Sequence, residues 1–201
     1  MTARVLLTGL LAGSAMFVWS GIAHMALPLG EAGVREIPNE KPALNALQAA
    51  LGESSGLYLF PGMGLGPDAT KQQKTAAMQD YGKKLAANPS GVLIYHPPGA
   101  TPLAARMFIT EFLTELVEAM LAVWLMAQAR LESFASRFGF VLVLGLMASL
   151  MTNVQYWNWY GFPTNYTAAY IFTEFMGFVV AGLIAAAMVK TAAPKSAAVA
   201  A

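Results

Sequence analysis

The chain has 201 residues, of which 57% are hydrophobic and only 11% are charged, whereas an ordinary soluble domain carries about 25% charged residues. This deficit of charge argues against a soluble globular protein. Twelve basic and eleven acidic side chains give a net charge of +1, so the chain lacks the basic surface that nucleic acid requires. Cysteine is absent, which excludes disulfides, thiolate catalysis and cysteine-ligated metals.

The first apolar run covers residues 5–29, follows Arg4 and is longer than the roughly 20 residues that a helix needs to cross a bilayer. A cleavable signal sequence has an apolar core of about 7–15 residues, whereas this run continues past Trp19 to Pro28. We therefore expect residues 1–29 to form a retained transmembrane helix. A cleaved signal sequence is the alternative.

Residues 30–102 carry six basic and six acidic side chains and predict a small α+β lobe outside the membrane. Two stretches of this lobe resemble each other, because each combines a helix, a glycine, a short strand and a Pro–Gly turn. The first has leucines at helical spacing before Gly52 and "SSGLYLFPG"; the second begins with a capping box at Thr70 and Gln73 and leads to "PSGVLIYHPPG". We expect the two strands to pair and both helices to lie on one face of them.

Three further apolar runs cover residues 104–129, 138–154 and 168–189. Together with residues 1–29 they predict an all-α membrane protein with four transmembrane helices, three of them within residues 103–190. The third run is the shortest, and aromatic residues typical of the headgroup region follow it. These interface aromatics are Tyr156, Trp157, Trp159 and Tyr160.

Basic residues at the ends of the helices predict the orientation of the chain. Arg4 precedes the first helix, Arg130 and Arg137 lie between the second and third, and lysines follow the fourth, whereas residues 155–167 carry no charge. The positive-inside rule then places both termini in the cytoplasm. Residues 30–102 are accordingly expected on the periplasmic side of a bacterial inner membrane. The tail, residues 191–201, is of low complexity and is expected to be disordered.

Four of the eleven acidic residues lie inside predicted membrane helices: Glu111, Glu115 and Glu118 in the second, and Glu174 in the fourth. An ionised carboxylate at mid-membrane costs roughly 2.5–3.5 kcal/mol on insertion scales, so we do not expect these side chains to face lipid. At about 100° per residue, the three glutamates of the second helix share one stripe.

The second and fourth helices carry matching tetrads, "ITEF" and "FTEF", which place Glu111 and Glu174 at one depth. The helices before them end in similar exits, "HMALP" and "NWYGFP". These matches favour two parallel hairpins related by a pseudo-two-fold axis along the membrane normal. The supporting polar residues expected around the glutamates are Thr110, Thr114, Asn153, Gln155 and Thr173.

The candidate ion or proton cluster consists of Glu111, Glu115, Glu118, Glu174 and His24. Carboxylates and imidazole suit a hard metal ion or protons, and close carboxylates share protons as a relay. The same groups also hold helices together through hydrogen bonds. The sequence names no cofactor: haem b would need a second membrane histidine, and His24 alone more often caps an aromatic contact.

These features predict a non-enzymatic integral membrane protein that serves as an accessory or scaffold subunit of a larger membrane complex. Its expected partners are the lipid bilayer and either another membrane protein or further copies of itself. The alternative is a transporter-like protein that handles protons or metal ions with its glutamates, and a membrane metalloenzyme is the third possibility. Pairs of small residues such as Gly9 and Gly13 predict close helix packing within the bundle rather than between copies.

The signatures "HMALP", "GLYLFPG", "LIYHPPG" and "YWNWYGFP" also resemble those of an uncharacterised group of bacterial four-helix inner-membrane proteins. The resemblance covers most of residues 15–190. It implies a four-helix membrane fold and brings no activity, so no catalytic residue follows from it.

Overall fold

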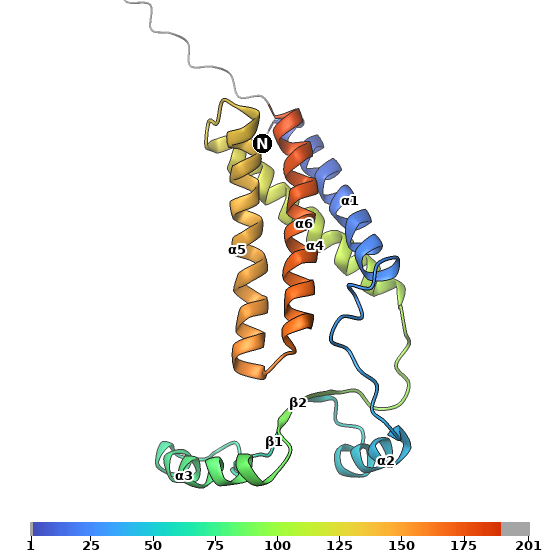
Figure 1. Ribbon diagram of the computed structural model, residues 1–201, viewed down its shortest axis with the longest axis vertical. Coiled ribbons are helices and arrows are strands. Elements are labelled where there is room, and N and C mark those ends of the chain that lie inside the picture. Colours follow the sequence, from blue (N-terminus) through green and yellow to red (C-terminus); the bar gives the residue numbers. More distant parts are fainter. Residues whose placement is uncertain (1, 190–201) are drawn as a thin grey trace, which may run out of the picture. The chain divides into compact units, whose positions relative to one another are not determined.

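The computed structural model describes residues 2–189, so the predicted tail at residues 191–201 lies outside the described residues. The chain divides into two compact units, one comprising Met1–Val34 with Leu103–Ala201 and the other Arg35–Pro102. The four-helix unit contains α1 (Ala3–Met25), α4 (Ala105–Gln128), α5 (Phe134–Tyr160) and α6 (Thr164–Met188) (Figure 1). The strand unit contains α2 (Glu40–Leu51), β1 (Gly56–Phe60), α3 (Lys71–Ala87) and β2 (Gly91–Tyr95).

Three helices among the described residues are long and apolar enough to cross a membrane: α1, α5 and α6. They support the prediction of a multi-pass membrane protein. The predicted fourth span, α4, is not among them. It has a comparable length of 24 residues, but Glu111, Glu115 and Glu118 interrupt its apolar surface.

Helix α5 is longer than its apolar run because the aromatic string continues the helix to Tyr160. The Ser133 side chain caps its start, and Gly161 ends it in the left-handed region at φ 70°, a conformation that glycine adopts without steric cost. The expected connection of residues 155–167 therefore shrinks to residues 161–163. Aromatic side chains lower the hydropathy of a segment without breaking its helix.

Within the four-helix unit, α1 packs along both α4 and α6, and α5 packs along α6, whereas α4 makes few contacts with α5. Small residues allow these close approaches. A side-chain carbon on Gly13 would lie 2.7 Å from Leu116 Cα, and one on Gly145 would overlap the Phe178 side chain. The close packing within the bundle that the glycines predict is thereby confirmed.

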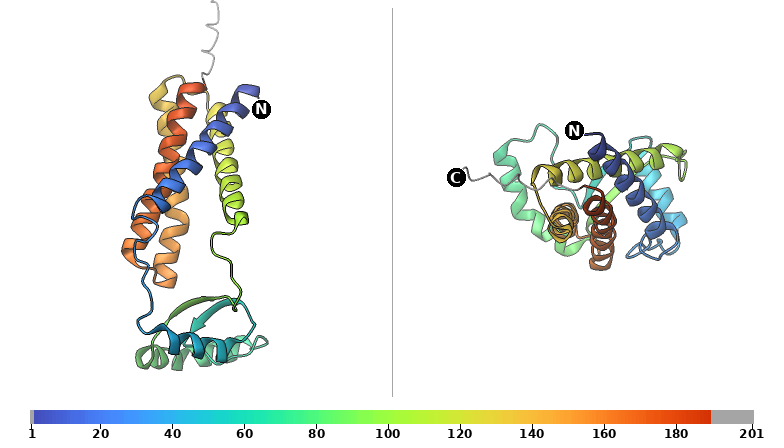
Figure 2. Two further views of the ribbon diagram at one scale, coloured as in Figure 1. Left: turned by 90° about the vertical axis from the view of Figure 1, so that its right-hand side faces the viewer. Right: turned by 90° about the horizontal axis from the view of Figure 1, so that it is seen from above.

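The two strands of the strand unit pair antiparallel, with Gly56 opposite Tyr95 and Phe60 opposite Gly91, which confirms the predicted pairing. Both predicted helix signals are also present, since Thr70 forms the capping box and Gly52 ends α2. Figures 1 and 2 draw α2 and α3 on one side of the strands. Neither helix buries a residue, so this unit has little core of its own.

Candidate functional site

The glutamate stripe of α4 has one buried member and two exposed members. Glu115 is only 9% exposed, and Glu111 and Glu118 lie on the exposed part of the helix. The Oε2 atom of Glu115 is buried and has no hydrogen-bond partner among residues 2–189. Within the described chain, this carboxylate oxygen is left unsatisfied, which is costly in an apolar environment.

Ser20 of α1 is the hydroxyl that faces this stripe, and sequence reasoning missed it. Its Oγ donates to Glu111 Oε1 at 3.4 Å. The Ser20 carbonyl oxygen lies 3.0 Å from His24 Nδ1 one turn later. The close packing of α1 on α4 thus brings a small polar side chain to a carboxylate of the stripe.

Glu174 of α6 has a stronger partner in α5. Asn153 Nδ2 donates to Glu174 Oε2 at 2.9 Å and also to the Ser149 carbonyl oxygen at 2.9 Å. Asn153 is buried, and its two hydrogen bonds fix the orientation of its side-chain amide. Glu174 thus has its hydrogen-bond partner within the α5–α6 pair.

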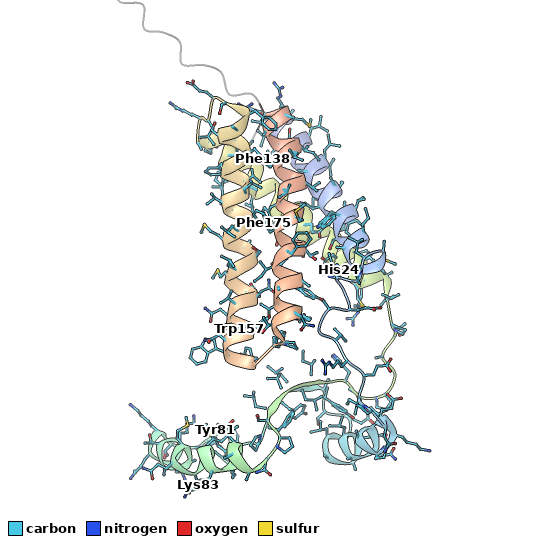
Figure 3. All side chains as sticks on the ribbon, viewed as in Figure 1. His24, Tyr81, Lys83, Phe138, Trp157 and Phe175 are labelled. Carbon is cyan, nitrogen blue, oxygen red and sulfur yellow. The ribbon has the colours of Figure 1, made fainter. Side chains whose placement is uncertain are left out.

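His24 contacts an aromatic side chain. Its ring meets that of Tyr170 edge-on at 5.6 Å between centroids, and Tyr170 in turn stacks on Tyr166 at 4.3 Å. Figure 3 labels His24 on α1. The contact agrees with the expectation that a lone membrane histidine caps an aromatic ring.

The predicted interface aromatics are exposed at the end of α5, and Trp157, labelled in Figure 3, donates through Nε1 to Thr164 Oγ1 at 3.2 Å. Tyr156 contacts Tyr160 and Phe162, and Phe162 contacts Tyr166. A continuous series of ring contacts therefore joins the end of α5 to His24. Tyr166, Tyr170 and Glu174 recur at four-residue spacing, a signal in the sequence that could have revealed the inner part of this series.

The hydrogen bonds of three further predicted polar residues, Thr110, Thr114 and Thr173, involve backbone carbonyl oxygens. Thr114 Oγ1 donates to the Thr110 carbonyl oxygen of its own helix at 2.9 Å. Thr173 is buried, and its carbonyl oxygen accepts from Trp19 Nε1 at 2.9 Å. Gln155 is exposed on α5.

Arg137 has a structural role that its placement at a helix edge did not predict. It is buried within α5, where Nε donates to the Ala186 carbonyl oxygen at 3.1 Å and Nη1 donates to those of Glu132 and Leu131 at 2.7 and 3.3 Å. The guanidinium thus joins the end of α6 to the connection between α4 and α5. Carbonyl groups at a helix end favour such a cation.

The two helix pairs repeat one arrangement. In the α1–α4 pair, Gly13 packs against Glu115 and Leu116, and Ser20 bonds Glu111. In the α5–α6 pair, Gly145 packs against Phe178, and Asn153 bonds Glu174. In both pairs the residue that packs against the glycine follows the hydrogen-bonded glutamate by four positions in the sequence. In both pairs the hydrogen-bond donor follows the glycine by about two helical turns.

Chemically, this site offers carboxylates, a hydroxyl, a carboxamide and stacked aromatic rings. Within residues 2–189, no three His, Asp or Glu side chains form a group that could hold a metal ion. The metal interpretation of the predicted cluster stays a prediction of the sequence. What the described geometry provides is hydrogen bonding between helices and an acidic face on α4.

Comparisons with known proteins identify no relative of this chain. No protein-family model, curated protein or solved structure matches the chain.

Proposed function

We propose that this chain is a non-enzymatic, multi-pass membrane protein that serves as an accessory or scaffold subunit of a larger membrane complex. The observation that carries the proposal is the acidic face of α4. Glu111 and Glu118 are exposed on a helix that packs along α1 but makes few contacts with α5. Carboxylates in a membrane helix require a partner or water, and the described helices leave both of these side chains exposed.

The proposal includes α4 as a fourth span. Its length matches that of the other three long helices, and α1 lies along it, so the two form an antiparallel pair. With Arg4, Arg130 and Arg137 on the cytoplasmic side, both termini are inside and residues 30–102 are in the periplasm of a bacterial inner membrane. Reporter fusions at Gln72 and Glu132 test this topology, and fusions that report the same side overturn it.

Extraction of native membranes in a mild detergent followed by native mass spectrometry tests the subunit role. We expect the 21.3 kDa chain at a fixed ratio with a second integral membrane protein. A chain recovered only as monomers or as multiples of its own mass contradicts the proposal. The topology test and this measurement are independent, because a four-span protein need not have a partner.

Proton handling by the glutamates is a second candidate, favoured by one specific observation. Glu115 is buried, and its Oε2 atom has no hydrogen-bond partner among the described residues. A buried carboxylate without a partner favours the protonated form and can take up and release a proton. Proton flux into vesicles containing the purified chain, measured under a potential and compared with Glu115→Gln, separates this candidate: flux that the substitution abolishes supports it, and absent flux contradicts it.

A further inference from the structure

We infer that the side of the four-helix unit between α4 and α5, here called the α4–α5 seam, receives a transmembrane helix of another protein that carries a lysine or arginine. The basic residue would lie at the depth of Glu111 and Glu118, which belong to the α4 side of the seam. This inference rests on the proposed subunit role and specifies the chemistry of the partner.

The arrangement of the helices leaves the seam open. If the α1–α4 and α5–α6 pairs were related by a two-fold axis, the packing of α1 on α6 would have a counterpart in packing of α5 on α4. The first contact is extensive and the second is slight. Helices α4 and α5 adjoin at residues 129–133 and diverge toward the start of α4 (Figures 1 and 2). One of two matching helix contacts is therefore much smaller than the other.

The charge beside the seam selects the occupant. Glu111 and Glu118 are exposed on α4. At about 100° per residue they share a stripe with the buried Ala122, whereas Leu116 and Met120, which meet the glycines of α1, lie on another face of the helix. The two glutamates therefore lie on the side of α4 that looks across the unit. Lipid tails on these carboxylates would cost several kcal/mol in total. A helix with a cation at this depth replaces that cost with a charge-assisted hydrogen bond.

A second copy of the chain does not supply this cation. Arg106 precedes Glu111 by five residues, about 7.5 Å along the helix, and Arg130 follows Glu118 by about 18 Å. Arg137 is buried and bonded to three carbonyl oxygens. In a parallel copy, these basic residues lie above or below the glutamates rather than level with them.

The test uses the full chain in phosphatidylcholine vesicles and a synthetic helix of about 20 leucine and alanine residues with one central arginine. The chain has no cysteine, so one label site can be introduced at Val117 on α4, which is 55% exposed. The matched site is Val18 on α1, which is 60% exposed. Energy transfer from a labelled peptide then reports which helix the peptide approaches.

We expect the arginine peptide to bind at least about tenfold more tightly than the same peptide with leucine, with greater transfer at Val117 than at Val18. Glu111→Gln with Glu118→Gln should reduce binding to the level of the leucine peptide, whereas Glu132→Gln, outside the stripe, should not. A peptide with a central glutamate tests on the unaltered chain whether binding requires a positive charge. It should bind no more tightly than the leucine peptide.

Equal binding of the arginine and leucine peptides overturns the inference, as does equal transfer at Val18 and Val117. Transfer between labelled copies of the chain that displaces the peptide makes a second copy the occupant and also overturns it. If native mass spectrometry finds a partner whose spans lack lysine and arginine, the subunit role stands and this inference fails. If no partner is found, the subunit role itself fails.

Discussion

The α1–α4 and α5–α6 pairs place a glutamate at equivalent positions but satisfy it differently. Asn153 donates to Glu174 at 2.9 Å and is itself fixed by a second bond, whereas Ser20 reaches Glu111 only at 3.4 Å. Glu115 of α4 retains an oxygen without a partner among the described residues. The difference teaches that α5 and α6 satisfy the Glu174 carboxylate between themselves, although the Thr167 hydroxyl of α6 also lacks a partner among the described residues, while the carboxylates of α4 have capacity left for a neighbour.

The largest expected effect concerns the cation that secures the α5–α6 pair. Arg137→Met removes the hydrogen bonds that the guanidinium donates to three carbonyl oxygens, and we expect it to lower the free energy of unfolding by about 3 kcal/mol. Thermal unfolding in detergent measures this. Arg106→Met, which removes an exposed guanidinium from the first turn of α4, is the control and should change stability by less than about 0.5 kcal/mol. Equal effects of the two substitutions would contradict this role.

Glycine substitutions test whether close packing is the same in both pairs. Gly145→Ala brings a methyl group onto Phe178, and Gly13→Ala brings one to 2.7 Å from Leu116 Cα; each should destabilise the protein by about 1–3 kcal/mol. Gly139 and Gly21 have no atom within 4 Å of an added carbon, so their alanine variants serve as controls on the same helices. If a control variant destabilised the protein as much as the variant on the same helix, lack of room for a side chain would not be the reason for the glycine.

The smallest effects separate the two glutamate contacts directly. Asn153→Ala removes the donor to Glu174 and should lower the free energy of unfolding by about 1–2 kcal/mol. Most of this loss should be absent when Glu174→Ala, which removes the acceptor, is already present. Ser20→Ala should cost less than about 0.5 kcal/mol, because its bond to Glu111 is long. Unfolding of the single and double variants gives the coupling energy of each pair. Equal coupling energies for the Asn153–Glu174 and Ser20–Glu111 pairs would contradict the difference between the α5–α6 and α1–α4 pairs.

Much of the helical architecture could be predicted because its signals are local. Apolar runs placed all four long helices to within a few residues at most ends, and α5 was the exception, since its aromatic end is helical but weakly hydropathic. The capping box at Thr70 and the glycine at Gly52 were recognised from a few neighbouring residues. Strand pairing followed from the repeated helix–strand pattern.

The partners of the polar residues were harder to predict because they come from distant segments. Asn153 was expected near the depth of the glutamates, but its bond to Glu174 depends on how α5 packs against α6. Ser20 was overlooked, since one serine in an apolar helix carries no pattern. Arg137 was read as a membrane-edge charge, whereas burial beside the end of α6 makes it a hydrogen-bond donor to three carbonyl groups.

The sequence by itself determined that this is a membrane protein, where its long helices lie, and that three glutamates share one face of α4. Hydropathy and helical spacing depend only on nearby residues, and so the chain alone specifies them. The tertiary structure decided which helices pair, that Asn153 bonds Glu174, and that α4 stays largely free of α5. Helix packing among apolar surfaces depends on the fit of small residues such as Gly13 and Gly145 against a particular neighbour, and that neighbour is known only once the chain is folded.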